Sequence, residues 1–128
     1  MKYYINKTIT ANFEQAIELV TEVLKTEGFG VLSEIDIQQK LKEKLDVDFR
    51  KYKILGACNP PNAYKALQHE DKIGVLLPCN VIIQELGNNE IEVAAVNPAA
   101  SMMAVDNKEL ADIAEEIKAK LERVIASL

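Results

Sequence analysis

The chain has 128 residues, of which 48% are hydrophobic and 27% are charged, a composition typical of globular proteins that excludes disordered and fibrous classes. This length predicts one domain, residues 1–128, with one hydrophobic core. The 15 basic and 20 acidic residues give a net charge of −5 without a basic cluster. We therefore expect no nucleic acid partner, because phosphate binding needs clustered Lys and Arg.

The apolar segments are too short for a membrane-spanning helix, which needs about 20 residues. The longest segment, from Ile73 to Ile83, is interrupted by Gly74, Pro78 and Asn80. The first residues lack the apolar region of a secretory signal. We expect a soluble cytoplasmic protein without a membrane partner, in which two cysteines are too few for a disulfide framework.

The first part of the chain predicts a strand, a helix and a second strand. The β-branched and aromatic residues of segment 2–10 are typical of a strand. Asn12 is a candidate N-cap with Gln15 as its capping-box partner, and Gly28 ends the helix. Segment 29–35 is the second strand. The apolar residues that recur at helical spacing are Phe13, Ala16, Ile17, Val20 and Leu24.

The middle of the chain predicts two short helices on either side of a third strand, residues 52–58. Asp36 and Gln39 form a second capping pair. Asn59-Pro60 is a favourable start for the next helix, because it combines a capping side chain with a proline where no N–H is needed. The residues that share one face of the helix after Asp36 are Ile37, Leu41 and Leu45.

The last part predicts a hairpin and a long closing helix. Segment 73–86 indicates a long fourth strand with a kink, a bulge or a sheet edge at Pro78, because proline cannot donate to a ladder. Segment 90–96 completes the hairpin. Asp106 and Glu109 form a capping box for the helix. Its apolar stripe consists of Leu110, Ile113, Ile117, Leu121, Val124 and Leu128.

This order predicts an α+β fold: one antiparallel sheet in the order β-α-β-β-β-β-α, with two long helices on one face and short helices in the connections. A strand that is apolar on both sides needs cover on both sides. We therefore expect a homodimer in which a second copy supplies the second cover. The fourth strand shows apolar residues at both parities: Val75, Leu77, Val81 and Ile83 against Leu76 and Ile82.

Two Cys-Asn pairs, Cys58-Asn59 and Cys79-Asn80, lie at the end or break of apolar strands. Cys58 precedes a predicted helix N-terminus, where partial positive charge stabilises a thiolate. It is therefore a candidate nucleophile, redox thiol or soft-metal ligand, with Cys79 as its partner. The alternative is that both thiols only pack in the core, as free cysteines often do. Asparagines in such positions are more often caps or turn-formers than catalytic groups.

Glu34 and Asp36 lie where the second strand passes into a helix. Paired carboxylates act as acid and base when their environments differ. Asp36 is better explained as an N-cap, and Glu34 as a solvent-exposed residue at a strand end.

Three segments carry a family resemblance: residues 28–36, 54–60 and 76–81. The chain resembles the "domain of unknown function 302" proteins over essentially its whole length, and these segments carry the match. The resemblance implies a compact α+β fold of the kind compared with half of the TATA-binding protein, a homodimer, and no DNA binding. The family has no agreed activity or established catalytic residues. It usually has Asp-Pro after the last strand, whereas this chain has Asn97-Pro98, which weakens any role that needs a carboxylate there.

We expect a homodimeric module that binds a small molecule or a soft metal ion near the two cysteines. The alternatives are a structural or protein-interaction domain, and a thiol redox enzyme in which Cys58 attacks and Cys79 resolves. Whether the protein is an enzyme stays open, no catalytic residue is assigned, and the cofactor is unknown. The candidate ligand-binding residues are Glu34, Asp36, Cys58, Asn59, Cys79 and Asn80.

Overall fold

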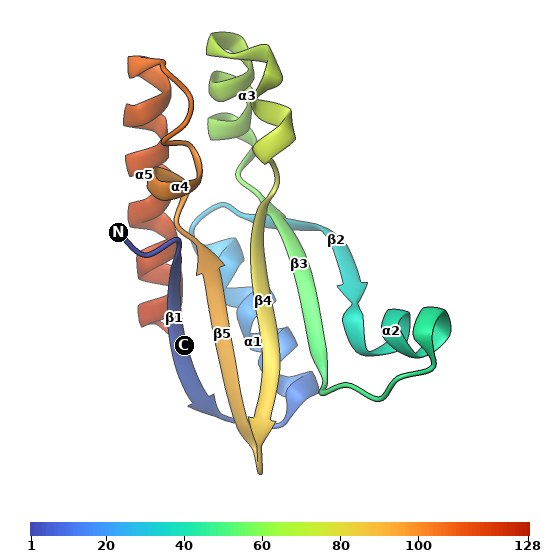
Figure 1. Cartoon of the computed structure of the whole chain (residues 1–128). Helices are drawn as coiled ribbons and strands as arrows, with labels where there is room; N and C mark the ends of the chain where they lie inside the picture. Colours follow the sequence, from blue (N-terminus) through green and yellow to red (C-terminus); the bar gives the residue numbers. More distant parts are fainter.

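The computed structural model describes residues 1–128 as one five-stranded antiparallel sheet, in the order β1-β5-β4-β3-β2, with helices between the strands (Figure 1). The strands are β1 (Tyr4–Thr10), β2 (Gly30–Asp36), β3 (Tyr52–Cys58), β4 (Cys79–Gly87) and β5 (Glu90–Val96). The helices are α1 (Phe13–Thr26), α2 (Ile37–Leu45), α3 (Pro60–His69), the 3₁₀ helix η1 (Asp71–Leu76), α4 (Pro98–Ser101) and α5 (Lys108–Ala126). The predicted α+β fold is confirmed.

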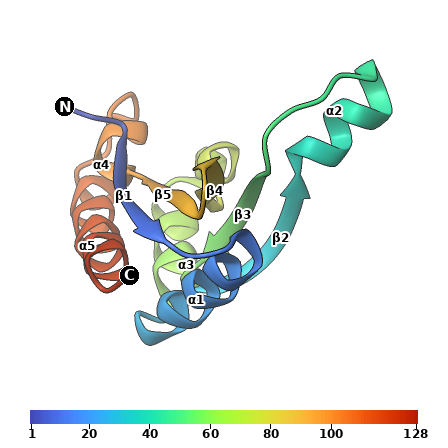
Figure 2. The ribbon, with the colours of Figure 1, turned by 90° about the horizontal axis from the view of Figure 1, so that it is seen from below.

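Both long helices lie on one side of the sheet, and the opposite face is open (Figures 1 and 2). Helix α1 packs on β2 and β4, and α5 packs on β1, β5 and α1. Strand residues at one parity are buried beneath them, including Leu55, Val81, Ile83, Ile91 and Val93. Each such side chain contributes roughly 1.5–3 kcal/mol when fully buried, so this layer is the core. Helix α3 packs on α5 beyond the end of the sheet.

The predicted N-caps at Asn12 and Asp36 are local and are confirmed. The N–H of Gln15 donates to Oδ1 of Asn12 at 2.8 Å, and the N–H of Gln39 donates to Oδ1 of Asp36 at 2.9 Å. Gly28 follows α1 with a φ of +84°, a left-handed conformation in which glycine carries no steric penalty. These short-range contacts fix where the helices begin and end.

The prediction of one long strand over residues 73–86 is wrong. Residues 71–76 form η1, and the strand begins at Cys79. The Leu77–Pro78 peptide is cis, and Pro78 has no N–H to offer a neighbouring strand. Within η1, Ile73 is buried, whereas Val75 is 85% exposed. The apolar alternation therefore belongs to β4 only from Cys79 onwards.

The predicted cap of the last helix is displaced by one residue. Asn107, not Asp106, accepts from the N–H of Leu110 at 3.3 Å. Its Nδ2 also donates to the carbonyl of His69 at 3.0 Å, which a carboxylate cannot do. The link to α3 therefore selects Asn107. No helix combines the length and apolar character that crossing a membrane requires.

Candidate functional site

The two cysteines line one cavity of about 240 Å³ at the end of the sheet, where β3 stops and β4 begins. Ala57 and Cys79 are register partners across this antiparallel pair, so Cys58 lies at the same end. Most of the wall is apolar. The other lining residues are Phe29, Leu32, Ala57, Asn59, Ala63, Ala66, Leu67, Gly74, Leu77, Pro78 and Ile117.

A β-bulge in β2 shapes one wall of this cavity. The register with β3 shifts between Val31 and Ser33, so Leu32 has no partner in the ladder. Leu32 lines the cavity and is 70% exposed, which places it at the mouth. Bulges are often found beside binding sites, because they redirect one side chain without ending the strand.

Gly56 in β3 allows Pro78 and Ser33 to approach the strand closely. A Cβ atom at this position would lie 2.9 Å from Cγ of Pro78 and would also collide with the Ser33 hydroxyl. The absence of a side chain therefore lets Pro78 pack against β3. This contact holds the segment that leads into Cys79.

The two thiols differ in their surroundings. Cys79 is buried, whereas Cys58 is partly exposed, and both are free. Burial, and to a smaller extent the electrostatic influence of nearby Cys58, raises the pKa of Cys79 from 9.0 to about 11. Cys79 is therefore a neutral thiol at physiological pH.

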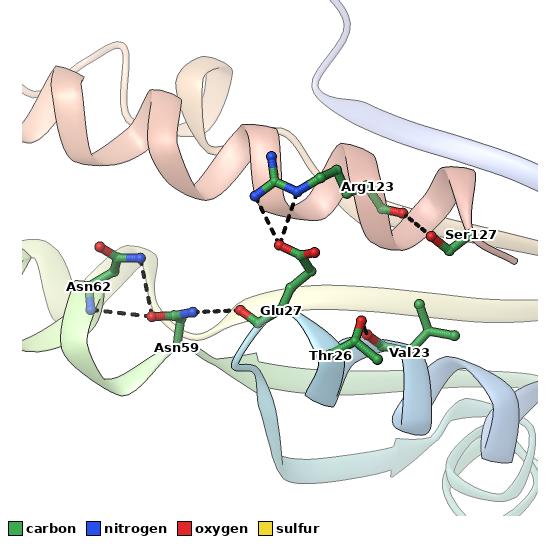
Figure 3. A network of polar contacts seen from close by, with 7 residues as sticks. All are labelled: Val23, Thr26, Glu27, Asn59, Asn62, Arg123 and Ser127. Atoms are coloured by element: carbon green, nitrogen blue, oxygen red, sulfur yellow. Dashed lines mark hydrogen bonds and ion pairs between the residues drawn. The ribbon is translucent and has the colours of Figure 1, made fainter.

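Asn59 lines the cavity and also belongs to a polar network (Figure 3). Its Oδ1 accepts from the N–H of Asn62 at 3.4 Å and from Nδ2 of Asn62 at 3.1 Å. Its Nδ2 donates to the carbonyl of Glu27 at 3.1 Å. The amide of Asn59 therefore joins the end of α1 to the start of α3, which is the cap that the sequence predicts together with a second link that it does not.

The same network continues to α5 through an ion pair. Nε and the terminal nitrogen of Arg123 donate to Oε1 of Glu27 at 3.1 and 2.9 Å. These hydrogen bonds lower the pKa of Glu27 and raise the pKa of Arg123. Sequence analysis missed this pair, because the two residues lie far apart in the chain and neither belongs to a local motif.

Three of the six candidate residues lie outside the cavity. Asn80 is exposed on the open sheet face, because neighbouring residues in a strand point to opposite faces. Glu34 is exposed in β2, and Asp36 caps α2. In the register of β2 with β3, Asp36 lies opposite Lys53, at the far end of the strand from Cys58. The structure thus brings together Cys58, Asn59 and Cys79.

Sequence analysis did not identify a second hollow, of about 440 Å³, on the open face of the sheet. Glu92 lies in it and accepts from Nδ2 of Asn6 at 2.9 Å and from Nε2 of Gln84 at 2.8 Å. The only sign of this hollow in the sequence was that Glu92 points to the same face of its strand as small and apolar residues. The other lining residues are Tyr3, Tyr4, Tyr52, Asn80, Ile82, Ala94, Ala95 and Val96.

No group of three or more His, Cys, Asp or Glu residues is arranged to hold a metal ion. At the cavity, Cys58 and Cys79 are the two side chains of these types in the wall. A metal ion held there would therefore depend on two sulfur ligands from one chain.

Comparison with known proteins identifies a family and solved structures that resemble this chain. A family model described as "Domain of unknown function DUF302" matches residues 5–128. The crystal structure of an uncharacterized conserved DUF302 protein from Bacillus stearothermophilus is similar, with a TM-score of 0.90 and 28% sequence identity over 98% of each chain. None of the curated proteins matches the chain.

Proposed function

The chain belongs to the DUF302 family, whose description assigns no activity, and from the geometry of the cysteine cavity we propose that it is a small-molecule binding module. The ligand is small, uncharged and largely apolar, and it binds between Cys58 and Cys79. The observation that carries this proposal is one apolar cavity that contains both thiols.

The size of the cavity supports a small ligand. A volume of 240 Å³ equals about eight waters at roughly 30 Å³ each, which suits a molecule of about ten non-hydrogen atoms. Pockets for drug-sized ligands are larger, from about 300 Å³ upwards.

The chemistry of the wall supports an uncharged ligand. Both polar atoms of the Asn59 amide are occupied by neighbours, so the amide offers little to a ligand. Cys79 is neutral, and a thiol is a weak donor and a weak acceptor. An ion in this cavity would therefore lose its hydration without gaining partners.

The soft-metal and redox alternatives are less well supported. Both require a thiolate, because the thiolate is the metal ligand and the nucleophile. The raised pKa of Cys79 opposes its ionisation. Free thiols are in keeping with the cytoplasm, the compartment that we propose.

Titration with benzene and indole tests the proposal, with calorimetry to detect binding and alkylation of Cys58 by iodoacetamide to detect occupancy. We expect binding and slower alkylation in the wild type. Ala63→Leu should abolish both effects without unfolding, because Ala63 lines the cavity and is only partly buried. Tight Cu(I) binding without binding of either probe would instead support the soft-metal alternative.

We also infer that the protein is a homodimer in which a second copy covers the open face of the sheet. This face carries Tyr4, Tyr52 and Ile82, and no helix of the chain covers it (Figure 2). An apolar sheet face without cover is typical of an interaction surface. Sedimentation velocity over a range of concentrations tests this inference, and a monomer throughout would contradict it.

A further inference from the structure

The connection between β2 and β3 leaves the body of the protein. We call residues 37–51 the α2 arm. Figure 2 shows α2 projecting away from the sheet on the side opposite α1. None of its helical residues is buried, and its main contact with another element is with β3. A nine-residue helix has little stability of its own in water, so the arm needs another source of order.

Part of that order comes from contacts within the arm. Asp36 caps the helix, and Nε2 of Gln38 donates to the carbonyl of Phe49 at 2.9 Å. Nζ of Lys42 lies 3.0 Å from Oδ1 of Asp46 near the end of the helix. The arm is therefore held in a defined shape, which lowers the entropic cost of docking.

The arm presents an apolar stripe that its own chain covers only in part, since Ile37 and Leu41 are half-buried. Ile37, Leu41 and Leu45 share one helical face, and Leu45 is 66% exposed. Lys44 lies seven residues after Ile37, so it belongs to the same face, and it makes no ion pair within its own chain. This face combines apolar side chains with a positive charge.

The hollow on the open sheet face is complementary to this face of the arm in both apolar character and charge. Tyr4, Tyr52 and Ile82 give it an apolar wall, and Glu92 is the only charged residue that lines it. The Glu92 carboxylate accepts from two amides but has no cationic partner in its own chain. The arm carries five basic and three acidic residues, in a chain whose net charge is −5. The arm is therefore positively charged, and the rest of the chain is negatively charged.

We propose that the α2 arm of each copy packs its stripe into the open-face hollow of a second copy. The occupant is thus a second copy of this chain. A two-fold axis relates the two copies, so each arm occupies the hollow of the other copy. Lys44 of one copy then lies near Glu92 of the other. The inference rests on the homodimer proposed above, and it adds which element of the partner covers the face.

A Trp reporter separates the arm contact from dimerisation itself, because the chain has no Trp. In Leu45→Trp, we expect fluorescence emission to shift to shorter wavelength as sedimentation shows the dimer to form. A dimer whose Trp emission stays that of an exposed indole would overturn the arm contact and leave the homodimer intact. A monomer at every concentration would overturn both.

Substitutions on the arm and in the hollow provide the second test. Leu45→Asp should weaken dimerisation by about tenfold or more, with unchanged circular dichroism because Leu45 is exposed. Leu19→Asp, a half-exposed leucine on α1, is the matched control and should leave the dimer intact. Lys44→Glu and Glu92→Lys should each weaken the dimer, and together they should restore it. Equal effects of both Leu→Asp changes, or no restoration, would contradict the proposal.

Discussion

At the scale of single residues, the cavity depends on positions where a side chain would be in the way. Gly56 lies where Pro78 and Ser33 approach β3, and Gly28 has a left-handed φ and lies close to Asn59. A Cβ at Gly28 would lie 3.1 Å from Nδ2 of Asn59. Both glycines are thus required by geometry at the site.

Gly56→Ala should lower the free energy of unfolding by roughly 1–3 kcal/mol, because the new methyl group overpacks the contact with Pro78. Urea denaturation measures the change. Gly30→Ala is the control, since a Cβ at Gly30 meets no atom within 4 Å, and its effect should stay within about 0.5 kcal/mol. Equal effects at the two positions would show that the close approach is unimportant.

The Cys79 thiol makes stability depend on pH. Its pKa rises from 9.0 to about 11 on folding, so the native state holds the proton more tightly than the unfolded state. The resulting stability is fully present below pH 9 and is lost as the pH rises to 11. Its size is roughly 2–3 kcal/mol, at 1.36 kcal/mol per pKa unit.

Unfolding free energies of the wild type and Cys79→Ala should therefore converge between pH 9 and 11. The variant is the reference because the two proteins share every other ionisable group. A difference between the two proteins that does not change with pH would show that burial does not perturb this thiol.

At the scale of elements, the asparagine caps do more than begin helices. Asn12 accepts one backbone N–H at the start of α1 and makes no other side-chain hydrogen bond. Asn59 and Asn107 each also donate to a carbonyl of another element, at Glu27 and His69 respectively. Side chains with one acceptor and one donor thus join α3 to α1 at one end and to the start of α5 at the other.

Asn59→Ala should lower the free energy of unfolding by roughly 2–3 kcal/mol, because it removes a cap and leaves the Glu27 carbonyl without its partner. Asn12→Ala removes a cap alone and should cost about 1 kcal/mol. Urea denaturation of the two variants tests the difference. If both cost the same, the link from α3 to α1 contributes nothing.

At the scale of the whole molecule, the layers leave one sheet face and one arm without cover. The buried strand residues lie beneath the two long helices, while α2 contributes no buried residue. The cysteine cavity lies at the end of the same core, with Ile117 of α5 in its wall. The proposed binding at the cavity and the proposed cover of the open face therefore concern separate parts of one fold.

We propose that residues 1–128 form one domain, and we predict one cooperative unfolding transition. Circular dichroism and the reactivity of the Cys79 thiol should change at the same urea concentration, because Cys79 is part of the single hydrophobic core cluster. Two separate transitions would show that the end of the sheet around the cavity unfolds as a unit of its own.

The features that the sequence by itself determined are local. The caps at Asn12, Asp36 and Asn59 and the apolar stripes of α1 and α5 depend on residues within a turn or two, and all are confirmed. The family and the α+β order also follow from short segments. The errors, at segment 73–78 and at Asp106, occur where η1 or a link to α3 overrides the local pattern.

Only the tertiary structure decided which distant residues meet. The register of β3 with β4 places Cys58 and Cys79 in one cavity, while strand alternation turns Asn80 to the opposite face. Glu27 and Arg123 meet because α1 and α5 pack side by side. Such contacts depend on how the sheet and helices stack, which short-range preferences do not specify, because packing energy depends on the whole chain.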